Sequence, residues 1–369
     1  MVTRQFASEG GLHLYSSQPT VFCPADLYCI DNDHGLRSQL VGCNLYLVTC
    51  RRRILIDPSS VSLDGPTLTG TFVVPRTDRW ERVPFRYPLR PEHIETTIDQ
   101  VDVATSESGT HVLVVNPTRK TLVASHVLVA ESESALTAED RDLDVLYVGK
   151  GLGRIRPRLA VDRLLRHETL QHILADFHTY HPQSEILLLL FRFEHSRNII
   201  SNGGDLNLEP MASLAMEAAN FEKMTSATFD RVDRIALAEA ALINHFKPTY
   251  NQVFKHTDFE DGKKLKTLKV ILNKGLTGLI VEICTANIRS RLRTQAMPAR
   301  DIDREFPEMS RGYRRLVQTG DDLGKQAAEQ WMAMQHTHNA NFALTSKEER
   351  ETFLHGICWI GETERQPFL

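Results

Sequence analysis

Glycines at the end of a short apolar strand open the region of the chain where chemistry concentrates. Residues 149–153 read Gly-Lys-Gly-Leu-Gly and directly follow the apolar run Val145–Val148. Between a strand and a helix, the backbone amides of such a loop can contact a phosphate. The segment lacks the GxxxxGK followed by Ser or Thr of mononucleotide-binding loops, and it lacks a GxGxxG motif with a downstream acid. The pattern therefore favours a phosphate contact and argues against an ATPase or a dinucleotide-binding enzyme.

Polar residues with helical spacing come next. Apolar residues recur with helical periodicity from Leu159 to Phe177, which predicts one amphipathic helix. Arg163 and His167 are four residues apart, so we expect them on one face of this helix, beside the glycine loop. Taken singly, each is also an ordinary surface residue of a helix.

A carboxylate and an amide lie further along the chain. The pattern predicts a helix over 232–246, stopped by Pro248, with Glu239 on it and Asn251 just after it. Alone, Glu239 could be a solvated helix acid and Asn251 a turn residue.

Together these segments resemble the GIY-YIG nuclease family. The run Tyr147-Val-Gly-Lys looks like the YIG-type strand of that family, and Arg163-Leu-Leu-Arg-His resembles its helix motif. The segment Glu239–Asn251 is similar to one in the excinuclease C subunit, with Glu, Leu-Ile, Pro and Asn at the same offsets, and it is the most specific match. The resemblance covers about Leu122–Asn251, a third of the chain. It implies a small antiparallel sheet flanked by helices and a metal-dependent endonuclease that hydrolyses phosphodiester bonds of DNA.

The resemblance also implies roles for individual residues. Glu239 would hold one Mg²⁺ or Mn²⁺ ion, which stabilises the leaving oxygen of a phosphodiester. Arg163 would pair with the scissile phosphate; Arg158 competes for this role, and Arg163 is preferred because a histidine follows it at helical spacing. Tyr147 would orient or deprotonate the attacking water, and Asn251 would order the loops of the site.

The tyrosine of the GIY motif is not found ahead of Tyr147. The corresponding strand is expected at Leu122–Val129, which contains no tyrosine. We predict that His126 faces Tyr147 there as a replacement base, because imidazole titrates near neutrality; a core or edge histidine is the alternative. His167 or Lys150 could also assist in proton transfer or contact the phosphate.

A lysine cluster follows the nuclease-like region and is a candidate grip on a nucleic-acid backbone, with a solvated helix face as the alternative. Its members are Lys263, Lys264, Lys266 and Lys269.

The surrounding patterns predict an α+β protein in three parts. Short β-branched runs and turn signals predict a β-rich domain over 1–110, followed by the GIY-YIG-like domain over 111–256. An α/β region completes the chain over 257–369. The first domain could join two copies of the chain or bind a partner protein.

Composition limits the partners. The 369 residues carry a formal charge of −4, so a nucleic-acid partner must be held by local patches. The six cysteines are dispersed without a CxxC pair, and the sequence has neither a signal peptide nor an apolar run that could cross a bilayer. We therefore expect a cytoplasmic protein with reduced thiols and no membrane contact. The alternative to a nuclease is a catalytically silent module that binds nucleic acid or protein; an enzyme requires Tyr147, Arg163 and Glu239 to converge on one open cleft.

Overall fold

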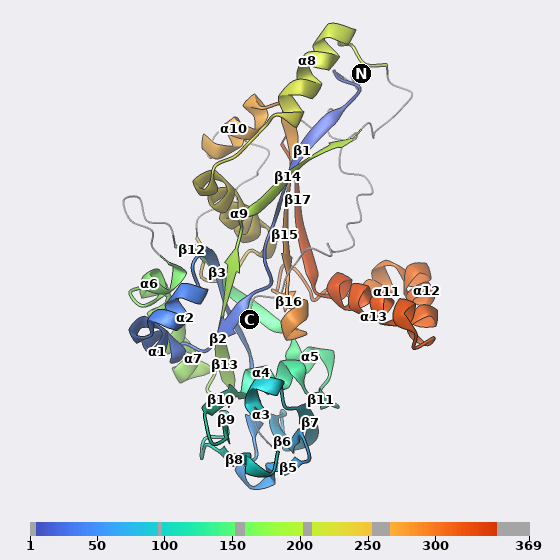
Figure 1. The fold of residues 1–369 in the computed structure, drawn as a ribbon. Coiled ribbons are helices and arrows are strands. Elements are labelled where there is room, and N and C mark those ends of the chain that lie inside the picture. The colour runs from blue at the N-terminus through green and yellow to red at the C-terminus, as the bar shows by residue number, and fades with distance from the viewer. Residues whose placement is uncertain (1–4, 95–97, 152–158, 202–208, 253–265, 345–369) are drawn as a thin grey trace.

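The computed structural model describes residues 5–94, 98–151, 159–201, 209–252 and 266–344. The described chain is an α+β fold, as the sequence predicts, with helices packed around several small sheets. It is elongated, with a small β-rich domain at one end and helix α8 (Leu214–Thr225) at the other (Figure 1). Within the described ranges, no helix is long and apolar enough to cross a membrane.

A five-stranded central sheet carries the candidate site. Its strand order is β16-β12-β3-β13-β2, and every pairing is antiparallel except that of β16 with β12. The strands are β2 (Thr20–Phe22), β3 (Cys43–Arg52), β12 (Leu143–Lys150), β13 (Ser184–Arg192) and β16 (Leu292–Arg293).

Both faces of this sheet are covered, so β3 is buried at every position except its last, and β13 contains a continuous buried apolar run over 186–191. One face, with Tyr46 and Leu188, packs against helices on the side where α1, α2, α6 and α7 gather in Figure 1. The other face, with Leu45 and Leu189, packs against α9 and the second sheet. These helices are α1 (Asp26–Asn32), α2 (His34–Gln39), α6 (Ala160–Leu164), α7 (Glu168–Tyr180) and α9 (Arg231–Phe246).

The second sheet extends away from the first with strand order β14-β1-β15-β17 (Figure 1). Its strands are β1 (Glu9–Tyr15), β14 (His195–Ser201), β15 (Leu276–Cys284) and β17 (Thr337–Ala343). Helix α10 (Lys266–Asn273) lies against α9 and β15. The short helix η4 (Ala286–Ile288) follows β15, and α11 (Ile302–Glu305), α12 (Pro307–Val317) and α13 (Asp322–Gln335) project to one side.

A small β-rich domain is inserted between β3 and β12. It has its own core, which includes Phe72, Phe85 and Val112. Its sheets have the orders β11-β7-β6-β4, with β5 paired to β6, and β10-β9-β8. The strands are β4 (Leu55–Ile56), β5 (Ser62–Asp64), β6 (Thr67–Pro75), β7 (Trp80–Pro88), β8 (Asp102–Thr105), β9 (His111–Val115), β10 (Lys120–Ala124) and β11 (Glu133–Ser134). The helices are η1 (Pro58–Ser60), α3 (Pro91–Ile94), η2 (Ile98–Gln100), α4 (Ser125–Glu131) and α5 (Ala138–Arg141).

The structure therefore divides the chain differently from the three consecutive parts over 1–110, 111–256 and 257–369. Strands β1, β2 and β3 pair with strands from later in the chain, and β15, β16 and β17 belong to the same two sheets. The β-rich domain comprises about residues 54–142. Periodicity identifies a strand but not the strand with which it pairs. In the sequence, a domain inserted between two paired strands is therefore indistinguishable from a separate domain that follows the first strand.

Candidate active site

Two tyrosines on paired strands form the floor of the site. Tyr46 of β3 lies opposite Gly149 of β12, and its ring stacks beside that of Tyr147 with 6.2 Å between ring centroids. The His167 ring completes the group, with centroids 5.9 Å from Tyr46 and 5.0 Å from Tyr147. Tyr46 is fully buried, and its hydroxyl has no hydrogen-bond partner among the described residues.

A β-bulge brings Tyr147 to the same face as Tyr46. Side chains alternate between the faces of a strand, and the pairing of β12 with β3 slips by one residue between Val145 and Tyr147. Leu146 and Tyr147 consequently both pack, with Tyr46, on the face that α1, α6 and α7 cover. Without the additional residue, Tyr147 would point to the opposite face.

Gly149 is required by the close approach of the tyrosines. A Cβ atom at this position would lie 2.5 Å from the Tyr46 hydroxyl oxygen and 2.7 Å from Cε1 of Tyr147. These separations are well inside van der Waals contact, so only glycine allows both rings to pack over the strand at this point.

Arg163 and His167 do not lie on one helix, contrary to the sequence prediction. Helix α6 ends at Leu164, and two tight-turn hydrogen bonds, from Arg166 N to Arg163 O and from His167 N to Leu164 O, separate it from α7. His167 is instead the N-cap of α7, where its Nδ1 accepts a hydrogen bond of 3.2 Å from the Leu170 amide. Apolar periodicity continues across the break, which is why the sequence alone shows one helix.

The capping role fixes the state of His167. Because Nδ1 accepts a hydrogen bond, the proton of the neutral ring lies on Nε2. Burial, together with the nearby positive charge of Arg163, lowers the pKa of His167 to about 4. At neutral pH the ring is therefore an uncharged donor through Nε2.

Arg163 supplies a positive charge to both tyrosines. Burial raises the pKa of Tyr46 and of Tyr147 above the ordinary value, and the guanidinium of Arg163 opposes that shift at both. Arg163 is exposed, and within the described part of the chain it forms no ion pair. Its guanidinium is thus available to an anion that enters from solvent.

Glu239 approaches the tyrosines from the other side of the sheet edge. Helix α9 begins at the N-cap Asp230, whose side chain accepts from Asp233 N, and ends at Lys247 in a left-handed conformation before Pro248. Glu239 lies midway along it and forms an ion pair with Lys150, with 2.7 Å between Nζ and Oε2. Burial and then the negative charge of Glu239 raise the pKa of Tyr147, and the two side chains line the same hollow.

Asn251 closes the edge of β12 beside the site. Among the described residues, β16 pairs only with Leu143 and Asp144, so the outer edge of β12 beyond this point has no strand partner. The Asn251 side chain replaces one: its Oδ1 accepts from Val148 N and its Nδ2 donates to Val148 O, both at 2.9 Å.

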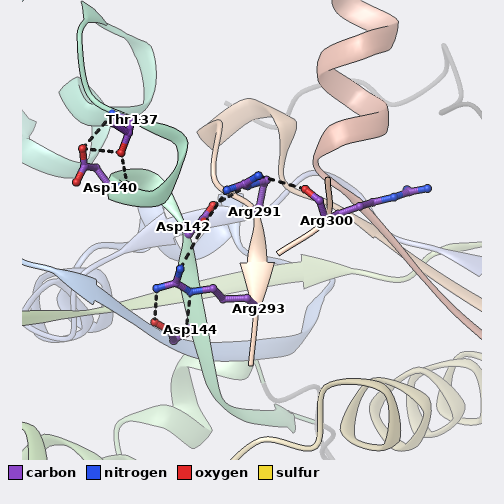
Figure 2. Close-up of polar contacts among 7 residues, drawn as sticks. All are labelled: Thr137, Asp140, Asp142, Asp144, Arg291, Arg293 and Arg300. Atoms are coloured by element: carbon purple, nitrogen blue, oxygen red, sulfur yellow. Dashed lines mark hydrogen bonds and ion pairs between the residues drawn. The ribbon is translucent and has the colours of Figure 1, made fainter. Parts of the chain in front are cut away.

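Two arginines, Arg293 of β16 and Arg291 just before it, hold the start of β12 (Figure 2). Arg291 donates to both carboxylate oxygens of Asp142 at 2.8 Å, and Arg293 donates to those of Asp144 at 2.9 and 3.1 Å. Arg291 also donates to the backbone oxygen of Arg300 at 3.2 Å. Paired, charge-assisted bonds of this kind fix orientation as well as distance, and they link β12 to the C-terminal part of the fold.

Two hollows meet at this group of residues. One, of about 490 Å³, is lined by Tyr147, Glu239 and Asn251, among others. The other, of about 720 Å³, is lined by Arg163 and His167, among others, and Thr169 lines both. Tyr147 and Glu239 therefore line one hollow and Arg163 lines the adjoining one, and both hollows are open to solvent.

The donor set fits a weakly held hard cation. Within the described ranges no cluster of three or more His, Cys, Asp or Glu residues could hold a metal ion. Glu239 offers a single carboxylate beside a hollow with room for water, and Mg²⁺ keeps several waters and needs only one or two carboxylates. Lys150 is the ion-pair partner that such a cation would have to displace or share.

His126 is not part of the site, and its prediction is wrong. The expected strand over 122–129 is the end of β10 followed by helix α4, and His126 lies on that helix in the inserted domain. It lines a separate hollow with His111 and His178, where burial lowers its pKa to about 4. The strand that pairs with β12 is β3, so Tyr46 occupies the place that the sequence assigned to His126.

The remaining predicted residues lie partly outside the description. Lys263, Lys264 and Arg158 fall outside the described residues, and Lys266 begins α10, of which only the backbone is described there. Lys269 is exposed on the same helix.

Searches of protein-family models, curated proteins and solved structures found no match to this chain.

Proposed function

We propose that this protein is a divalent-metal-dependent endonuclease that hydrolyses phosphodiester bonds of DNA at the cleft around Tyr147, in the manner that its resemblance to GIY-YIG nucleases implies. The observation that carries the proposal is the grouping of three side chains from separate elements around Tyr147: Glu239 lines the same hollow as this tyrosine, and Arg163 lines the adjoining hollow with its positive charge close to the phenol. Packing alone does not require a phenol, a guanidinium and a carboxylate to meet there.

Arg163 binds the scissile phosphate in this proposal. Its planar fork matches two phosphate oxygens, and it neutralises the negative charge that grows in the transition state. Its exposure and its freedom from ion pairs in the described part of the chain leave it available for this contact.

The tyrosines position the attacking water. With raised pKa values, both phenols carry their protons at neutral pH, so a proton leaves Tyr46 or Tyr147 only when positive charge gathers around it. Arg163 supplies part of that charge. The neutral His167 donates from Nε2 to water or phosphate and does not act as the resting base.

Glu239 would hold the divalent ion, Mg²⁺ or Mn²⁺, and Lys150 would share its carboxylate. The ion supplies charge stabilisation to the leaving oxygen when bound. Lys150 fixes the position of the Glu239 carboxylate relative to β12 through their ion pair. Asn251 fixes the edge of β12 through its hydrogen bond with Val148.

The same ion pair is the observation that favours a second candidate. If Lys150 holds Glu239 permanently, the carboxylate cannot take a metal ion, and the cleft would bind nucleic acid or protein without cleaving it.

Cleavage of labelled DNA with and without Mg²⁺ or Mn²⁺ tests both candidates. We expect Glu239→Gln to lower metal-dependent cleavage by orders of magnitude, since it removes the negative charge and preserves shape. Glu185→Gln is the matched control, because Glu185 pairs with Arg51 at 2.6 Å and its side chain is 15% exposed, against 14% for Glu239. Equal cleavage by the two variants would refute Glu239 as the metal ligand, whereas no cleavage by the natural protein would refute the enzyme and leave the silent module.

A further inference from the structure

The larger hollow has an aromatic wall that the proposed chemistry does not use. Tyr28 of α1 lines it opposite the α6–α7 turn, and this tyrosine is 69% exposed. Among the described residues its ring has no aromatic or cationic partner, and its hydroxyl has no hydrogen bond. Helix α1 contacts α6, the helix that carries Arg163 (Figure 1), and Tyr28 and Arg163 line the same hollow.

The charges of this hollow favour an anion with a planar group attached. Two of its carboxylates are already paired, since Arg37 bridges Asp31 at 2.6 Å and Asp162 at 2.5 Å. Arg163 and Arg166 line the hollow, are exposed, and form no ion pair within the described ranges. Glu168 also lines the hollow, forms no ion pair with any described residue, and can accept a hydrogen bond from an amino group.

We propose that this hollow binds an unpaired nucleobase, stacked on Tyr28, whose neighbouring phosphate is held by Arg163. The inference rests on the proposed nuclease function and specifies its substrate class. Aromatic rings bind bases of any sequence by stacking on their π faces. A volume of about 720 Å³ accommodates one nucleotide with water.

The geometry excludes an intact duplex from this contact. Both faces of a base in a duplex are covered by its neighbours, and its edge is paired, so only a base that has left the stack can present a face to Tyr28. The preferred substrate is therefore DNA with at least one unpaired nucleotide beside the cleaved phosphate.

Binding without divalent metal tests the inference separately from cleavage. The probes are a labelled duplex and the same duplex with one unpaired nucleotide, measured by fluorescence anisotropy with the full chain in EDTA. We expect the natural protein to bind the second probe about tenfold or more tightly than the first. Tyr28→Ala should remove that preference while leaving duplex binding unchanged, and Tyr28→Phe should keep it.

Tyr180 provides the matched control. It is 72% exposed at the C-terminal end of α7 and does not line this hollow, so Tyr180→Ala should retain the preference. An unchanged preference in Tyr28→Ala, or equal binding of the two probes by the natural protein, would overturn the inference. If the inference is overturned in this way but metal-dependent cleavage is observed, the nuclease proposal still holds. If binding shows a Tyr28-dependent preference but no cleavage is observed, the nuclease proposal is refuted and the base-binding site still holds.

Discussion

Replacing Asn251 by alanine tests whether one side chain holds the edge of β12. Asn251 is 7% exposed and forms both of its strand-like hydrogen bonds, each 2.9 Å long, with Val148. Asn251→Ala leaves the Val148 N–H and C=O without these partners at a sheet edge that no described strand covers.

The magnitude follows from the two groups left unpaired. A buried polar group without a partner costs about 1–3 kcal/mol, and entry of water favours the low end. The free energy of unfolding should therefore fall by about 2–4 kcal/mol. Tyr147 adjoins Val148, and a shift of about 1 Å at a reacting group can lower a rate by about 100-fold, so cleavage should fall as well.

Urea unfolding and single-turnover cleavage measure the two effects. Asn116→Ala is the matched control: Asn116 is 6% exposed, accepts from Thr118 N at 3.0 Å and Arg119 N at 2.7 Å, and belongs to the inserted domain. It should lose comparable stability and keep its cleavage rate under folding conditions. The reasoning fails if Asn251→Ala changes the unfolding free energy by less than about 0.5 kcal/mol, or if both variants lose cleavage equally.

Two further substitutions probe packing and pH. Gly149→Ala places a Cβ 2.5 Å from the Tyr46 hydroxyl oxygen and should reduce cleavage by about 100-fold. Gly312→Ala is the control, because the added Cβ meets open space on α12; it should leave cleavage unchanged and raise the melting temperature. Equal cleavage by both variants would contradict the packing argument. Burial lowers the pKa of His245 to about 4, below its value of about 6.5 in the unfolded chain, so its contribution to stability is present above about pH 6.5 and is lost as the pH falls toward 4. Between pH 7 and pH 5 this loss is at most about 2 kcal/mol. The free energy of unfolding of His245→Phe, measured with urea at the two pH values, should therefore fall by less than that of the natural protein. An equal fall in the two proteins would contradict the assigned pKa shift.

Local patterns in the sequence identified much of the candidate site. Tyr147, Glu239 and Asn251 were predicted from short motifs, and each motif stays within one element or its flanking turn. Their convergence depends on strand pairing and helix packing, which the spacing of residues within one element does not specify.

Tyr46 shows why the rest could not be predicted. About 100 residues separate it from Tyr147 in the chain. The apolar segment nearest to Tyr147 that fits a partner strand is 122–129, where the β-branched and apolar residues are compatible with a strand or a helix. The backbone turns into α4 after Ala124, and His126 leaves the site with it.

The inserted domain determines when the strands of the candidate site can pair during folding. Its ends enter and leave where Cys50 pairs with Asp144, so the two tyrosine strands meet only when about 90 intervening residues bring their ends together. For a disordered segment of that length, closure costs about 3 kcal/mol more than for a four-residue turn. The inserted domain has its own core, so it can fold first. Its folding would then offset the closure entropy and place the ends of β3 and β12 side by side. A destabilised insertion would then slow assembly of the central sheet, although none of residues 54–142 lines either hollow of the candidate site.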